Sequence, residues 1–161
     1  MLLLVAGGCT SPAPAPKSAP RPPAIATPVA PPAPVVQTAT LIGLYEGAPA
    51  LRRNQMCMIE RSGRTSFAMV VWGAGERSCS GSGRAVRQGD RLLLTMEGES
   101  SCILDARISG GRVILPGLVP QSCAYYCGEG AQLGGATFDK TGGTQGDALR
   151  ATDLAGDPLC G

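Results

Sequence analysis

The stretch Cys102-Ile103-Leu104-Asp105-Ala106-Arg107-Ile108 decides the fold class, because apolar and polar side chains alternate along it. A period of two places Cys102, Leu104, Ala106 and Ile108 on one face of a strand, and Asp105 and Arg107 on the other. The strand predicted over residues 101–108 leads into Ser109-Gly110-Gly111 and then into a second strand over residues 112–115. Two strands joined by a short glycine turn predict a β-hairpin.

The same rhythm continues towards the N-terminus, where further strands are predicted over residues 41–46, 55–61, 65–72, 79–87 and 91–97. The turns Ser62-Gly63-Arg64 and Gln88-Gly89-Asp90 join four of them into two more hairpins. Residues 67–72 form a continuous apolar run, which is typical of a strand buried on both sides. These segments predict an all-β domain, a small antiparallel barrel or sandwich built from hairpins. After Pro120 only a short helix over residues 147–154 is predicted, with Asp147 near its N-cap.

The predicted core is poor in large side chains, because the chain has 23 glycines and only six aromatic residues. A core with few large side chains buries little apolar area, so disulfides are expected to supply part of the stability of the domain. Six cysteines lie beyond residue 37, and an even number in a small exported domain predicts three disulfides. Each disulfide adds roughly 2–4 kcal/mol to the free energy of unfolding. The six are Cys57, Cys79, Cys102, Cys123, Cys127 and Cys160.

The connectivity stays open at this point, because six cysteines allow many pairings. As a working expectation we take Cys57–Cys79, Cys102–Cys123 and Cys127–Cys160. A zinc site is disfavoured, because only Cys123 and Cys127 are closely spaced and the chain has no histidine.

Residues 1–8 are mainly apolar and end in Ala6-Gly7-Gly8, directly before Cys9. This pattern resembles the lipobox of bacterial lipoproteins, in which the signal is cleaved before a cysteine that becomes acylated. The family usually has leucine where this chain has Ala6, and a basic segment before the apolar residues. We therefore expect residues 1–8 to be a truncated signal-peptide remnant and Cys9 to be the lipidated residue.

Ten prolines lie between Pro12 and Pro34. Such a segment favours extended polyproline II and cannot pack into a core, so residues 9–36 are expected to form a disordered tether. Residues 37–161 then form the disulfide-rich β domain. In the lipoprotein family an aspartate directly after the cysteine tends to retain the protein in the inner membrane, and Thr10 stands there. The resemblance therefore implies anchorage through acyl chains in the outer membrane, with the domain in the periplasm.

The net charge of +2 comes from Lys17 and Arg21 in the tether, so residues 37–161 are neutral overall. No basic run with interleaved aromatic residues occurs, and a nucleic-acid partner is therefore not expected. The expected partners are the membrane, through Cys9, and an envelope protein or peptidoglycan.

Catalysis has little support in the sequence. The absence of histidine excludes a Ser-His-Asp triad, a Cys-His pair and any histidine metal ligand. We expect no cofactor and no metal. Glu97, Glu99 and Asp105 offer carboxylates for glycoside hydrolysis, but they lie around a predicted turn, where acids are usually just solvated.

The segment Cys123-Ala124-Tyr125-Tyr126-Cys127 is the most distinctive one. Tyr125 and Tyr126 are either an exposed recognition pair or a cover for an open end of the β domain beside two disulfides. The structural interpretation is preferred.

The leading hypothesis is a non-enzymatic envelope protein with a binding or structural role. An alternative is an inhibitor of a lysozyme-type cell-wall hydrolase. In format the chain is similar to the membrane-bound lysozyme inhibitors, which are lipid-anchored, disulfide-bearing β barrels. Ser82-Gly83-Arg84 resembles their serine-glycine inhibitory loop, although Val86 stands where a tyrosine is expected. A second alternative is a hydrolase that uses Glu97, Glu99 or Asp105.

Overall fold

The computed structural model describes residues 40–47 and 52–161. The predicted signal remnant, the lipidated Cys9 and the tether up to residue 36 lie outside the described residues. Among the residues that are described, no helix has both the length and the apolar character needed to cross a bilayer.

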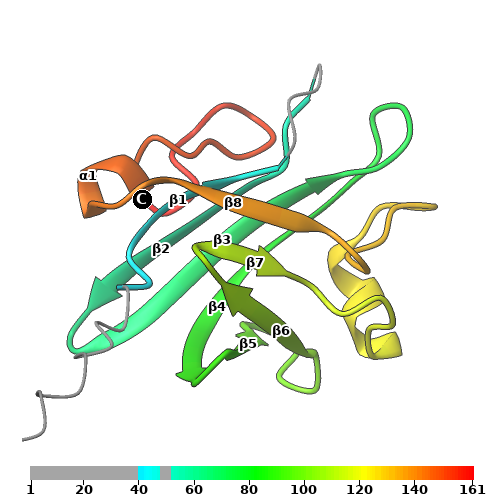
Figure 1. Cartoon of the computed structure of the whole chain (residues 1–161). Coiled ribbons are helices and arrows are strands. Elements are labelled where there is room, and N and C mark those ends of the chain that lie inside the picture. Colours follow the sequence, from blue (N-terminus) through cyan, green and yellow to red (C-terminus); the bar gives the residue numbers. More distant parts are fainter. Residues whose placement is uncertain (1–39, 48–51) are drawn as a thin grey trace, which may run out of the picture. The chain divides into compact units, whose positions relative to one another are not determined.

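Eight antiparallel strands close into a barrel in which each strand pairs with its neighbour in the chain and the last pairs with the first (Figure 1). A 3-10 helix, η1, covers one end of the barrel, and a one-turn α-helix follows the last strand. The bounds are β1 Gly43–Glu46, β2 Gln55–Arg61, β3 Arg64–Trp72, β4 Ser78–Gln88, β5 Arg91–Met96, β6 Ile103–Ser109, β7 Arg112–Ile114, η1 Gln121–Tyr126, β8 Thr137–Gly142 and α1 Gln145–Ala148.

The prediction of a small antiparallel β domain is confirmed, and of the two architectures considered the barrel is the one formed. The three predicted hairpins are β2–β3, β4–β5 and β6–β7. The turn between β2 and β3 has positive φ at both Ser62 and Gly63, as does the turn at Gly110 and Gly111 between β6 and β7. Two such residues give the turn a twist that matches the flanking strands, which explains why these short sequences reverse the chain.

Two predictions after Pro120 need correction. The segment expected to be irregular contains β8, the strand that closes the barrel between β7 and β1. The helix begins at Gln145 and ends at Ala148, not at residues 147–154. Its N-cap is Thr144, whose hydroxyl accepts from the Asp147 amide, while the Asp147 carboxylate accepts from the Thr144 amide. Asp147 therefore completes a capping box inside the helix.

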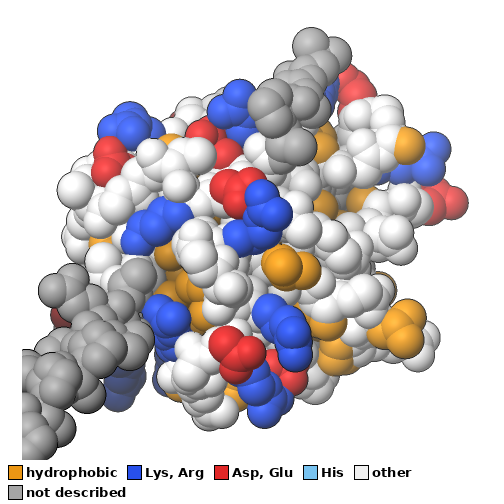
Figure 2. Space-filling view, viewed as in Figure 1, with side chains coloured by type: hydrophobic (Ala, Val, Ile, Leu, Met, Phe, Trp, Pro, Cys, Tyr) orange, Lys and Arg blue, Asp and Glu red, His pale blue; other side chains and the backbone are white. Residues whose placement is uncertain are grey.

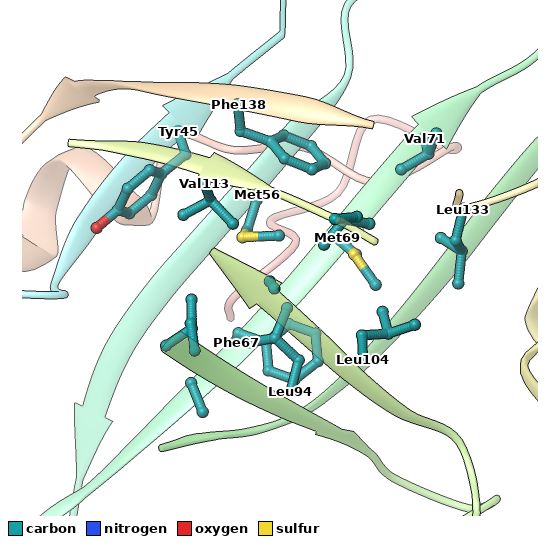
Figure 3. Packing of buried hydrophobic residues seen from close by; sticks show 14 of the residues in the cluster. Tyr45, Met56, Phe67, Met69, Val71, Leu94, Leu104, Val113, Leu133 and Phe138 are labelled. Carbon is teal, nitrogen blue, oxygen red and sulfur yellow. The ribbon is translucent and has the colours of Figure 1, made fainter. Parts of the chain in front are cut away.

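Side chains fill the barrel (Figure 3). Inward-facing positions alternate along each strand, as predicted for Cys102, Leu104, Ala106 and Ile108, all of which are buried. The chain compensates for its few aromatic residues with methionines, whose flexible thioethers fill irregular gaps. The interior includes Tyr45, Met56, Met58, Phe67, Met69, Leu92, Leu94, Leu104, Val113 and Phe138.

A second apolar cluster lies on the outside of β1, β2 and β3. Leu44, Ile59 and Ala68 alternate with inward-facing residues, so they point away from the interior, yet they are buried. The C-terminal segment, which we define as residues 149–161, covers them together with α1. This explains why the run from Phe67 to Val71 is buried throughout: one face meets the interior, and Ala68 on the other face meets the cluster under the C-terminal segment.

The three predicted disulfides are present, but two of the three expected pairings are wrong. Cys102–Cys123 is confirmed. Cys57 pairs with Cys160 instead of Cys79, and Cys79 pairs with Cys127. The positions of these cysteines in the barrel determine which of them can pair. Cys57 faces outward from β2 towards the C-terminal segment, whereas Cys79 lies next to η1 at the covered end.

Candidate functional site

The two tyrosines of η1 have different environments. The hydroxyl of Tyr126 donates to the Glu97 carbonyl (2.7 Å) and accepts from the Glu99 amide (2.8 Å), so it holds the loop between β5 and β6. Tyr125 is 78 % exposed and contacts Tyr126 edge-to-face. Tyr126 therefore has a structural contact with this loop, whereas the Tyr125 ring is exposed, and its recognition role stays a prediction.

Replacing Tyr126 with phenylalanine is expected to lower the free energy of unfolding by about 1–2 kcal/mol, because the Glu97 carbonyl and the Glu99 amide both lose their partner. Tyr125→Phe is the matched control, with an expected change within about 0.5 kcal/mol. Equilibrium unfolding in urea measures both. Equal effects of the two substitutions would contradict the bridging role of the Tyr126 hydroxyl.

The three candidate carboxylates have different partners and different exposure. Asp105 lies on the outer face of β6 and accepts hydrogen bonds from Nε and Nη2 of Arg91, which lower the pKa of the carboxyl. Glu99 accepts from the hydroxyl and the amide of Ser101, and these hydrogen bonds lower its pKa. A general acid at neutral pH needs a raised pKa, and neither group has one. Glu97 is exposed and faces a groove described below.

Ser82-Gly83-Arg84 lies in the middle of β4, paired with β3 on one side and β5 on the other. It is therefore part of the barrel wall and not a protruding loop. Elsewhere in the barrel, Tyr45 of β1 lies opposite Lys140 of β8, and burial raises the pKa of Tyr45 to about 12 and lowers that of Lys140. The Lys140 ammonium donates to the Thr40 carbonyl and lies 5.5 Å from the Tyr45 ring centroid.

The outer wall of the barrel carries a groove over β3, β4 and β5, which we call the β4 groove. Its volume is about 660 Å³, and it continues into a smaller hollow beside the end of the C-terminal segment through four shared lining residues. The wall contains two arginines, one glutamate and several hydroxyl groups. Its polar side chains are those of Arg61, Ser66, Arg84, Thr95, Glu97 and Ser100.

The groove exists because outward-facing side chains around Arg84 are small. Ser66 of β3 and Thr95 of β5 lie directly opposite Arg84 on its two sides. Gly83 precedes it, and a Cβ there would lie 2.0 Å from the Thr95 carbonyl oxygen, so the two strands approach closely only because this residue is glycine. The sequence did not lead us to this groove. The run Ser80-Gly81-Ser82-Gly83 is the local sequence feature that accompanies the groove, and such a run is equally typical of a turn.

The fold and its surface define a small closed antiparallel barrel, stapled by three disulfides, with a filled interior and a polar groove on its outer wall. No family model, curated protein or solved structure matches the chain.

Proposed function

We propose that the protein is a lipid-anchored binding protein of the bacterial cell envelope, without enzymatic activity, that holds its ligand on the outer wall of the barrel. The anchor is Cys9, the expected location is the periplasmic face of the outer membrane, and the described β domain carries the binding surface.

The filled interior is the observation that carries this proposal. Barrels of this size hold either side chains or one small ligand. Here the central positions are taken by large side chains that are fully buried, among them Tyr45, Phe67 and Phe138. A ligand therefore has to bind outside, and the β4 groove is a polar hollow of sufficient size there.

The surface chemistry also favours binding over catalysis. The Asp105 and Glu99 carboxyls have lowered pKa values, as expected for acids in ion pairs and turns. Basic and acidic side chains are interspersed over the face that carries β7 and β8 (Figure 2), where Arg112 and Asp139 form a two-pronged ion pair. A mixed surface of this kind supports solubility and gives no strong field for a nucleic acid.

The inhibitor alternative shares the disulfide-stapled barrel format, but its Ser82-Gly83-Arg84 segment is held in β4 by hydrogen bonds on both sides. A segment in this position does not reach into the active-site cleft of another protein. We therefore prefer a ligand bound in the groove to an inhibitory loop.

Expression from the native gene in a Gram-negative host tests the anchor directly. Intact-mass measurement of the membrane fraction is expected to show an acylated Cys9, and a mass lower by six hydrogens for the three disulfides. Cys9→Ser is the control and is expected to abolish acylation and release the protein from membranes. An unmodified Cys9, or free thiols among the other six cysteines, would overturn the proposed location.

A further inference from the structure

The β4 groove presents two arginines that pair with no aspartate or glutamate of the described residues. Five arginines of the described residues are paired with acids: Arg52, Arg53, Arg91, Arg112 and Arg150. The Arg84 side chain makes no hydrogen bond or ion pair within the described part of the chain, and it is exposed over the groove. Arg61, the second arginine of the groove, forms no ion pair with an aspartate or glutamate of the described residues either.

Arg61 is held in place by the backbone of the C-terminal segment. Its Nη2 donates to the carbonyl oxygen of Cys160 (3.2 Å) and to the main-chain oxygen of Gly161 (2.5 Å). Cys160 is itself fixed to β2 by the disulfide to Cys57. These hydrogen bonds use only Nη2 of the Arg61 guanidinium and fix the orientation of the group. A side chain that is already oriented loses less conformational entropy when it binds a ligand.

Hydroxyl groups and one carboxylate complete the wall. Ser66, Thr95 and Ser100 offer groups that both donate and accept hydrogen bonds. The Glu97 carboxylate has no hydrogen-bond partner among the described residues and accepts from hydroxyl or amino groups. The groove therefore combines sites for an oxyanion with sites for a polar, hydroxyl-rich body.

We propose that the β4 groove binds an acidic sugar, with its carboxylate or phosphate at Arg84 and Arg61 and its hydroxyl or amino groups along Ser66, Thr95 and Glu97. Guanidinium forks match the planar oxygens of a carboxylate and the oxygens of a phosphate equally well. This inference rests on the proposed binding function and adds the chemical class of the ligand.

Calorimetric titration of the oxidised full chain tests the proposal with three probes. N-acetylmuramic acid supplies a carboxylate, N-acetylglucosamine 6-phosphate supplies a phosphate, and N-acetylglucosamine is the neutral control. Saturable binding of at least one acidic probe is expected, with the neutral sugar at least about tenfold weaker, because a charge-assisted hydrogen bond is lost. Comparison of the two acidic probes identifies the preferred oxyanion.

Arg84→Gln is expected to weaken binding of the acidic probe by about tenfold or more, since it removes a cation whose side chain forms no hydrogen bond or ion pair with the described residues. Arg107→Gln is the matched control. Arg107 is an exposed arginine on the outer face of β6 that does not line the groove, and its loss is expected to leave binding unchanged. Thermal unfolding verifies that both variants are folded.

Failure of both acidic probes to bind, or equal binding by wild type and Arg84→Gln, would overturn the acidic-sugar proposal. That failure is separable from failure of the proposed envelope function. A chain acylated at Cys9 that binds no acidic sugar loses only the ligand assignment, whereas an unmodified Cys9 removes the location whatever the groove binds.

Discussion

Replacing Cys57 and Cys160 together with alanine is expected to lower the free energy of unfolding by about 4.7 kcal/mol. This disulfide joins residues 103 positions apart, and a cross-link restricts the unfolded chain more when the loop it closes is longer. Small domains have only about 5–15 kcal/mol in total, so the variant is expected to be marginally stable. The loss of stability also has a local part. Without the disulfide, the C-terminal segment can detach from the barrel, which exposes Leu44, Ile59 and Ala68 to water.

The matched control is Cys102→Ala with Cys123→Ala, which removes a disulfide spanning only 21 positions. Its expected cost is about 3 kcal/mol on the same entropic scale. Guanidinium unfolding of the two double variants under identical conditions gives the comparison. A larger loss for the Cys102–Cys123 variant would show that loop length and the covered cluster do not determine the stability of this domain.

Phe138→Ala is expected to cost about 3–5 kcal/mol, the usual range for a large aromatic residue removed from a core. Phe138 is completely buried, comes from the closing strand β8, and lies opposite Val113 of β7 inside the barrel (Figure 3). The cavity left by its ring cannot be filled easily, because a closed barrel restricts the movement of its walls. Equilibrium unfolding in urea, with the slope checked for constancy, measures the change.

Two further variants make this test specific. Phe138→Leu keeps much of the apolar volume and is expected to lose clearly less than Phe138→Ala. Leu118→Ala removes a side chain that is 94 % exposed and is expected to change the free energy of unfolding by no more than about 0.5 kcal/mol. Equal costs for Phe138→Ala and Leu118→Ala would contradict the role of β8 in closing the core.

The hairpins could be predicted from the sequence because their signals are local. Alternation in residues 102–108 and glycine at the turns depend on neighbours only a few positions apart, so β2 to β7 were located to within a few residues. β8 was missed for the opposite reason. In Thr137–Gly142 the only large apolar residue is Phe138, and Lys140 takes the next inward-facing position, so no apolar alternation is left to detect.

Lys140 is tolerated there because the strand ends at the mouth of the barrel, where its ammonium reaches the Thr40 carbonyl. The predicted helix bounds were also wrong because residue type alone did not identify the N-cap. Asp147 is a good N-cap residue by type, but Thr144 three positions earlier forms the reciprocal pair with it. The two N-cap positions are three residues apart, and the helix ends at Ala148, six residues before the predicted end.

The β4 groove could not be predicted from the sequence, for a different reason. Arg61 and Arg84 are 23 positions apart and belong to strands that do not pair with each other, so no local pattern relates them. Tyr125 and Tyr126 are adjacent and look equivalent in sequence. Only the position of the loop between β5 and β6 separates an anchoring tyrosine from an exposed one.

The sequence by itself determined the β class, the hairpin turns and the use of all six domain cysteines in disulfides, because these follow from residue type and short-range periodicity. Only the tertiary structure decided which cysteines pair, how the barrel closes and where a polar groove opens. Those features depend on contacts between residues far apart in the chain, and many chain paths satisfy the same local pattern before the strands are packed.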